Sequence, residues 1–198
     1  MPRRLILPLL LAATPALADD VDRGETPDDM GDQSIAAELG AASGGRVTPG
    51  GLRIAGHYYY QLSATDWFDG TAAFTYGSGD AGCFRDRMDT VICDHGVADG
   101  GGLEIAAGVR RFFTAQGQFR PFLRAAAGLA IVRFPDDSVT GLALPLHAGG
   151  GVRARIAEGI AVVGEGELSL GIGVFNRGLG LEPQFGLAVT AGAEFRLP

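Results

Sequence analysis

The feature that most constrains the fold is a strict alternation of polar or small residues with aliphatic residues, repeated in eight segments of about ten or more residues. Glycine, proline or aspartate separates the segments. In an extended chain, alternate side chains share one face, so each segment predicts a strand with one polar and one apolar face. A tilted strand needs about 9 to 11 residues to cross a bilayer. The eight predicted strands are Gln33–Ala42, Leu52–Leu62, Trp67–Tyr76, Leu103–Phe113, Phe119–Phe134, Leu142–Ile156, Ile160–Val174 and Pro183–Leu197.

The polar faces carry nearly balanced charges, and we expect them to form the interior of a barrel. An arginine facing lipid near the midplane would cost about 2 to 4 kcal/mol, so these charges cannot all lie on the lipid side. The same faces are rich in glycine and alanine, which leave room in a crowded lumen. The predicted lumen charge network is Glu38, Arg53, Asp69, Glu104, Arg110, Arg120, Arg124, Arg153, Arg155, Glu165, Glu167, Glu194 and Arg196.

The apolar faces end in aromatic residues, as expected for side chains at the two interfaces of a membrane. One girdle is predicted near the short connections and another near the longer ones. Their members are Tyr60, Phe68, Phe113, Phe119 and Phe195, and Phe74, Tyr76, Phe175 and Phe185, respectively.

Glu165 and Glu167 lie one residue apart on a polar face, within the sequence GEGELSLGIGV. We expect them to pair with Arg153 and Arg155 on the preceding strand and with Arg196 or Arg124 nearby. Such pairs would fill the lumen structurally. The alternative interpretation is a path for protons or ions.

The first 18 residues have a basic start, an apolar stretch and a small-residue cleavage pattern, which predict a secretory signal peptide. Residues 19–32 hold seven acids against one arginine and are predicted to be a disordered leader. A calcium site in the leader lacks the residue offsets of a known binding loop. Without the signal, 14 arginines face 23 acids, a net charge of about −9, which disfavours nucleic acid as a partner.

The connections alternate between short segments (63–66, 114–118 and 157–159) and mostly longer ones (43–51, 77–102, 135–141 and 175–182). An even strand number with this alternation places both termini at the periplasmic end. The 77–102 segment holds Cys83 and Cys93, which we expect to form a disulfide in an oxidising compartment. Two free thiols or half a metal site are the alternatives. We take this loop as the recognition candidate, through Phe84, Arg85, Arg87 and Met88, although a merely stapled loop fits equally well.

This pattern, together with segments such as GVRRFF followed by FRPFLRAAAGLAIVRF, resembles the small eight-stranded outer-membrane barrels of Gram-negative bacteria, the OmpA-like and opacity-type family. The resemblance implies an all-β, antiparallel up-and-down transmembrane barrel over residues 33–198. It also implies a filled interior and action through the surface loops, as an adhesin, envelope stabiliser or binder. The chain departs from the family in ending Phe195-Arg196-Leu197-Pro198 rather than on an aromatic residue.

The expected function is therefore that of a structural or surface-interaction protein of the outer membrane. We expect contact with lipid and lipopolysaccharide, a possible extracellular partner at the loops, and a monomer without cofactor or metal. An eight-stranded lumen is too narrow for a general diffusion pore. Two other classes stay open: an enzyme that modifies lipid A, and a soluble periplasmic ligand-binding barrel. His57 and His147 fall on the inward faces and His95 in the loop, and no catalytic constellation is evident.

Overall fold

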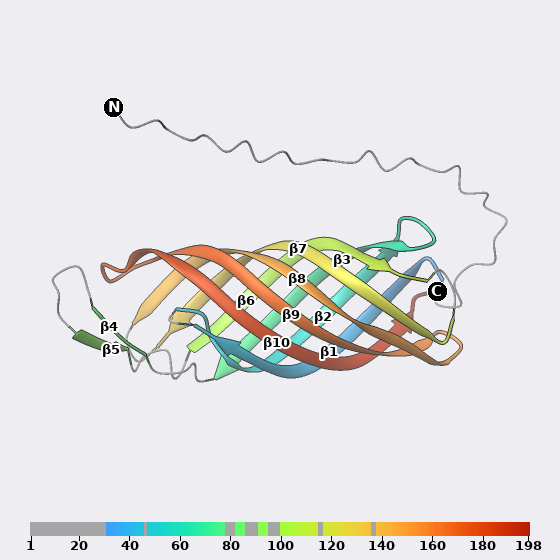
Figure 1. Cartoon of the computed structure of the whole chain (residues 1–198), viewed down its shortest axis with the longest axis horizontal. Coiled ribbons are helices and arrows are strands. Elements are labelled where there is room, and N and C mark those ends of the chain that lie inside the picture. The colour runs from blue at the N-terminus through green and yellow to red at the C-terminus, as the bar shows by residue number, and fades with distance from the viewer. Residues whose placement is uncertain are drawn as a thin grey trace, which may run out of the picture.

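The computed structural model is a closed barrel of eight antiparallel strands with a separate two-stranded hairpin (Figure 1). It describes residues 31–45, 47–77, 82–85, 91–94, 100–114, 117–135 and 138–198. The barrel strands are β1 (Gln33–Gly44), β2 (Gly51–Gln61), β3 (Asp66–Gly77), β6 (Gly100–Phe112), β7 (Phe119–Phe134), β8 (Val139–Ala157), β9 (Ile160–Phe175) and β10 (Gly180–Arg196). The hairpin is β4 (Gly82–Arg85) with β5 (Val91–Asp94). Among these residues no helix has the length and hydrophobicity to cross a membrane.

The predicted fold class is confirmed, and each predicted strand matches an observed one within a few residues. The expectation of longer loops at 135–141 and 175–182 is wrong. Strands β7 to β10 are 16, 19, 16 and 17 residues long, against 11 to 13 for the other four barrel strands. The ladders continue to Phe134↔Val139 and Gly180↔Phe175, so each connection is only four residues. In Figure 1 these yellow to red strands reach farthest toward the β4–β5 end.

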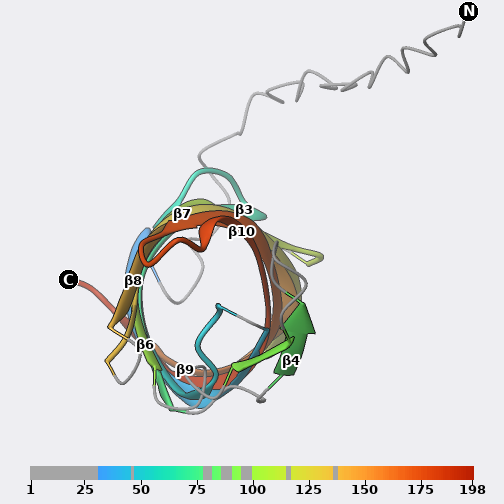
Figure 2. The same ribbon diagram turned by 90° about the vertical axis from the view of Figure 1, so that its left-hand side faces the viewer.

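Each barrel strand pairs with its sequence neighbours, and β1 closes the ring against β10 (Figure 2). The stagger of the barrel follows from the residues paired between neighbouring strands. Starting at Leu52 on β2, the paired residues are Tyr76, Gly101, Arg133 and Thr140, and the series ends in the β9–β10 turn, where Asn176 faces Leu179. In the other direction around the barrel, Leu52 pairs with Ala41 on β1, which pairs with Val189 on β10. The two series therefore reach β10 at residues 179 and 189. This offset of ten residues after one circuit of the barrel is its shear number. With eight strands this shear corresponds to a tilt of about 41°.

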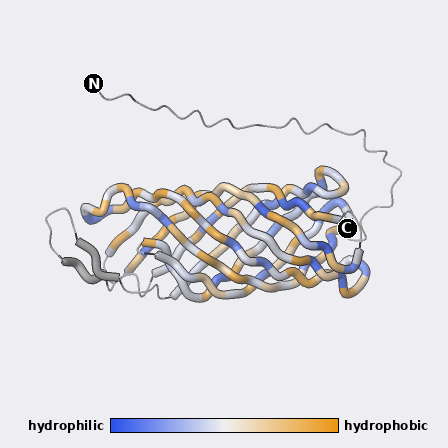
Figure 3. Tube along the Cα trace, viewed as in Figure 1, coloured by the Kyte–Doolittle hydropathy of each residue, from blue (hydrophilic) through white to orange (hydrophobic). Residues whose placement is uncertain are grey.

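Side-chain exposure alternates along the eight barrel strands and shows which face is inside. Hydrophilic and hydrophobic residues also succeed one another along these strands (Figure 3). Glu165 is 6% exposed, whereas Leu170 and Ile172 on the same strand are 50% and 52% exposed. The charged face therefore lines the lumen and the aliphatic face forms the outer surface.

Two clusters of buried apolar side chains fill opposite ends of the lumen. Near the short turns lie Ala36, Tyr59, Trp67, Phe112, Phe122 and Val163. At the other end lie Val47, Ala130, Val132, Phe134, Val139, Ala143 and Phe175.

The placement of Phe175 corrects one member of the predicted girdles. Phe175 is 4% exposed and packs inside the barrel, where its ring covers Gly141 on β8. The lack of a side chain at Gly141 provides the space for this ring. The other aromatic residues of the two predicted girdles lie on the outer surface at intermediate or high exposure.

Candidate functional site

The lumen near the short turns is closed by arginines stacked on aromatic rings. The Arg110 guanidinium carbon lies 4.4 Å from the Tyr59 ring centroid and 4.0 Å from that of Phe122. The guanidinium carbons of Arg120 and Arg153 lie 4.2 and 4.6 Å from the Phe112 ring centroid. Cation–π contacts are strongest where water is excluded, so this layer forms a compact plug.

We call the ten charged residues at mid-barrel the lumen cluster. Its members are Arg53, Arg110, Arg124, His57, His147, Glu38, Asp69, Glu104, Glu165 and Glu167. It holds three arginines and two histidines against five carboxylates. The cluster is therefore neutral when both imidazoles are protonated.

Arg124 on β7 contacts three carboxylates of the cluster, whereas Arg53 and Arg110 contact two each. Its Nε donates to Asp69 Oδ2 at 2.8 Å, its Nη2 donates to Thr71 Oγ1 at 2.7 Å, and its Nη1 contacts both Glu165 and Glu167. Arg110 donates from Nη2 to Glu165 Oε2 at 2.8 Å. Asp69, Glu165 and Glu167 thus each contact two or more cationic side chains, which offsets part of the cost of removing them from water.

The glycines of β8 explain how Arg124 reaches two strands away. Gly149 and Gly151 face the lumen between β7 and β9. A Cβ at Gly149 would lie 3.2 Å from Glu165 Oε1, and one at Gly151 would lie 2.0 Å from the Gly164 carbonyl oxygen. The missing side chains leave the path along which Arg124 meets Glu165 and Glu167.

The ion pairs therefore differ from those expected between adjacent strands. The expected partner Arg124 does contact both Glu165 and Glu167, but their other arginine partners, Arg110 for Glu165 and Arg53 for Glu167, were not expected. Arg153 lies 3.3 Å from Glu194 Oε1, which also accepts from Ser34 Oγ at 2.7 Å. Arg196 is exposed at the end of β10, and Arg155 is half-buried beside a register shift of β8. Long arginine side chains span so narrow a lumen, so adjacency in the sheet does not select the partner.

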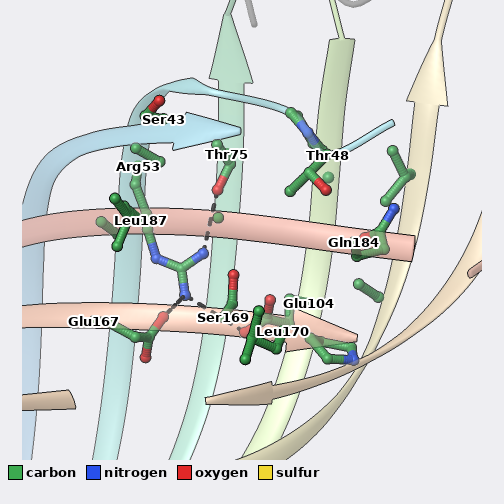
Figure 4. Close-up of a pocket in the computed structure, with 18 residues that line it drawn as sticks. Ser43, Thr48, Arg53, Thr75, Glu104, Glu167, Ser169, Leu170, Gln184 and Leu187 are labelled. Atoms are coloured by element: carbon green, nitrogen blue, oxygen red, sulfur yellow. Dashed lines mark hydrogen bonds and ion pairs between the residues drawn. The ribbon is translucent and has the colours of Figure 1, made fainter. Parts of the chain in front are cut away.

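Toward the other end of the barrel, Arg53 holds two carboxylates beside a small cavity (Figure 4). Its Nη2 lies 3.4 Å from Glu104 Oε1 and 3.2 Å from Glu167 Oε1, and its Nη1 donates to Thr75. The cavity has a volume of about 50 Å³, which is room for a few water molecules. A second space of about 10 Å³ lies between Arg53, His57 and Arg124.

The β1–β2 connection folds over this cavity and lines it with Thr48 and Pro49 (Figures 2 and 4). Val47 is 2% exposed, and its carbonyl oxygen accepts a hydrogen bond of 2.7 Å from Gln184 Nε2. Thr48 Oγ1 accepts from the Phe185 backbone N–H at 3.2 Å. The connection is thus a fixed cover of the lumen rather than a free loop.

His57 and His147, the two histidines within the described residues, lie in the lumen without the geometry of a catalytic triad. Asp69 Oδ1 and Thr71 Oγ1 both approach the same nitrogen of His57, Nδ1, at 3.0 and 3.2 Å. A triad requires the acid and the hydroxyl on opposite ring nitrogens. His147 lies 3.2 Å from Glu104 and 3.1 Å from Glu167, both of which also contact Arg53. Within the described residues no group of three or more metal-binding side chains has the arrangement of a metal site.

Sequence reasoning named the charges of this site and left out its neutral partners. Ser34, Tyr59, Trp67, Thr71, Thr75 and Thr190 all face the lumen and are under 10% exposed. Thr190, for example, donates to Glu38 Oε2 at 2.6 Å. Each lies on the polar parity of its strand, and that signal would have found them.

The predicted recognition loop is described only in part. The backbone places Cys83 directly opposite Cys93 in the β4–β5 ladder, with Phe84 and Arg85 in β4. Arg87, Met88, His95, the signal segment and leader residues 19–30 lie outside the described residues. The disulfide, the recognition role, the signal and the leader stay predictions.

With this geometry established, the fold can be compared with known structures. The crystal structure of Neisserial surface protein A matches at a TM-score of 0.61 and 12% identity, covering 83% of this chain and 97% of that one. A major outer membrane protein from Thermus thermophilus and the outer membrane enzyme PagL match at TM-scores of 0.46 and 0.45. Each is 15% identical and covers 83% of this chain and 99% of its own. No protein-family model and no curated protein matches the sequence. The first match shows that the chain has the fold of a small outer-membrane β-barrel.

Proposed function

We propose that the chain is an integral protein of the bacterial outer membrane, whose barrel is a sealed anchor that presents extracellular loops to lipopolysaccharide or to a partner outside the cell. The main support for this proposal is that the barrel is polar inside and apolar outside, the reverse of a soluble barrel. Charged residues such as Asp69 and Arg110 are 0% and 1% exposed, whereas most outward leucines, isoleucines and valines are 43% to 69% exposed.

This polarity argues against the soluble ligand-binding alternative. A soluble protein rarely exposes a contiguous apolar patch of more than a few hundred Å². Here apolar side chains cover the outer face of every barrel strand. A bilayer removes that surface from water, and a soluble barrel would not.

The filled lumen argues for an anchor rather than a pore. The stacked arginine and aromatic layer leaves no room for a water molecule between Tyr59, Trp67, Phe112 and Arg153. The 50 Å³ cavity lies on the other side of the lumen cluster and has no described continuation through it. Solutes larger than water therefore have no path along the axis.

Two measurements on the full chain test this proposal. The protein should fractionate with the outer membrane and show a heat-dependent change of mobility on gels. In planar bilayers, the purified folded barrel should give no stable conductance steps under conditions in which a general porin does. Recovery in the soluble periplasmic fraction would refute the membrane assignment, and stable porin-like conductance would refute the sealed lumen.

A further inference from the structure

The apolar belt on the outer surface is much taller on one side of the barrel than on the other. Continuous outward apolar or small residues run from Leu142 to Ile156 on β8 and from Leu181 to Phe195 on β10. On the other side of the barrel they run only from Leu52 to Leu62, at the end of β2, and from Phe68 to Tyr76 on β3. At the tilt found above, each residue rises about 2.5 Å, so the belt is about 30 to 35 Å tall on β8 to β10 and about 20 to 25 Å tall on β2 and β3.

The register shows where the excess lies. Because the shear is 10 over eight strands, residues at equal height along the barrel axis are offset from the paired residues by 1.25 positions per strand. Leu52 therefore lies at the same height as Leu170 on β9 and Leu187 on β10. Outward apolar residues above that level on these longer strands are Leu142, Leu144, Ile172, Val174, Leu181 and Phe185, each 48% to 64% exposed. They extend the belt by about 10 Å beyond an apolar band that is about 25 Å tall in outer-membrane barrels.

The same face carries two glycines that nothing inside the barrel requires. Gly164 and Gly166 on β9 point outward, and a Cβ at either would have no atom within 4 Å. Neither has a positive φ. Among the described strand glycines within ordinary backbone geometry, no others have such open space. Glycine weakens a strand, but it permits close approach of another backbone from outside.

We infer that the outer face of β8 to β10 binds a second copy of this chain, in a dimer whose two-fold axis runs parallel to the barrel axis. The inference rests on the proposed membrane location. Under this symmetry the two 10 Å extensions meet at the same height and cover each other, which lipid of ordinary thickness does not do. The face has no charged side chain between Leu142 and Ile156 or between Val162 and Val174 that would require desolvation.

The size of the face is sufficient for such a contact. Three strands spaced about 4.8 Å apart, each with an outward apolar run about 40 to 46 Å long along the strand, present roughly 600 Å² per copy, or about 1,200 Å² in total. Because the barrel wall is curved, two copies bury only part of this face, which brings the contact near the roughly 1,000 Å² of the smaller specific interfaces. This inference departs from the monomer expected from the sequence.

Cysteine cross-linking in native membranes tests the dimer, with a depth-matched control on the opposite side. In a Cys83→Ser/Cys93→Ser background, Gly166→Cys is compared with Gly56→Cys on β2. Gly56 also points outward, with only ordinary contacts at 3.9 to 4.0 Å, and lies four residues below Leu52 as Gly166 lies four below Leu170. Gly166→Cys should give a disulfide-linked homodimer at least tenfold more efficiently than Gly56→Cys.

A bulky substitution provides the complementary measurement. Gly166→Leu should weaken dimerisation at least tenfold in native mass spectrometry from detergent, and Gly56→Leu should leave it unchanged. Equal cross-linking at both positions, a monomer in both experiments, or cross-linking of Gly166→Cys to a different protein would overturn the inference. Membrane fractionation of the same samples separates this failure from failure of the membrane assignment.

Discussion

Removal of Arg124 should destabilise the barrel more than removal of any exposed arginine. Arg124→Met keeps the length and apolar stem of the side chain but deletes its contacts with Asp69, Glu165, Glu167 and Thr71. The lumen cluster would then hold two arginines and two histidines against five carboxylates.

The structure sets the size of the effect. Asp69 is 0% exposed and Glu165 is 6% exposed, so water cannot replace the lost cation. Leaving a buried charge without its partner typically costs about 3 to 5 kcal/mol. Arg110 and Arg53 still contact these acids, which places the expected loss toward the lower end, at about 3 kcal/mol.

The matched control is Arg111→Met on the neighbouring strand β6. The Arg111 side chain is 71% exposed and lies 3.7 Å from Asp66, so its loss should cost no more than about 1 kcal/mol. A rescue variant, Arg124→Met/Asp69→Asn, removes an uncompensated acid together with the cation. It should lose less stability than the sum of the two single changes, because the pair is coupled.

Urea unfolding of the protein in lipid vesicles measures these changes. Trp67 is the only tryptophan of the chain and is 1% exposed in the lumen, so its fluorescence reports opening of the barrel. A loss below 1 kcal/mol for Arg124→Met, or a loss equal to that of Arg111→Met, would refute the role assigned to the lumen cluster.

Three further predictions follow from the packing and the loop. Phe175→Ala should lose about 3 to 5 kcal/mol in the same unfolding assay because the ring is buried, whereas Phe185→Ala, which is 48% exposed on the outer face, should lose clearly less. Gly151→Ala should sharply lower the yield of heat-modifiable folded protein because its Cβ would lie 2.0 Å from the Gly164 carbonyl oxygen, whereas Gly164→Ala should fold normally; equal yields would contradict the packing. Cys83 and Cys93 should resist alkylation in denaturant until a reductant is added, and immediate labelling of both thiols would exclude the disulfide.

The fold could be predicted from the sequence because side chains alternate between the two faces of a strand. The position of a residue in its strand therefore determines which face its side chain occupies. A register error of one residue would have moved Glu165 to the outer face and Leu168 to the lumen. The strand ends near residues 135–141 and 175–182 were less predictable. Serine, threonine and glycine there fit either a loop or the end of a protruding strand, and packing of Phe134 and Phe175 beneath the sheet decides for the strand.

The lumen site was predictable in composition but not in pairing. Parity places Arg124, Glu165 and Glu167 inside, yet the partner of each depends on three-dimensional reach across the barrel. That reach is set by Gly149 and Gly151, whose absent side chains open the path between β7 and β9. The β1–β2 connection folds over the lumen and buries Val47. No periodic pattern in the sequence indicates this placement.

The central claim is that the charged face is inside and the aliphatic face contacts lipid, and quenching of tryptophan by lipids with brominated acyl chains tests it directly. In wild-type protein the single Trp67 should keep its fluorescence in such vesicles, because it is enclosed in the lumen. In Trp67→Phe/Leu170→Trp, the new tryptophan lies on the outer face and should be strongly quenched. Strong quenching of Trp67 together with a protected tryptophan at position 170 would show that the barrel has the opposite polarity.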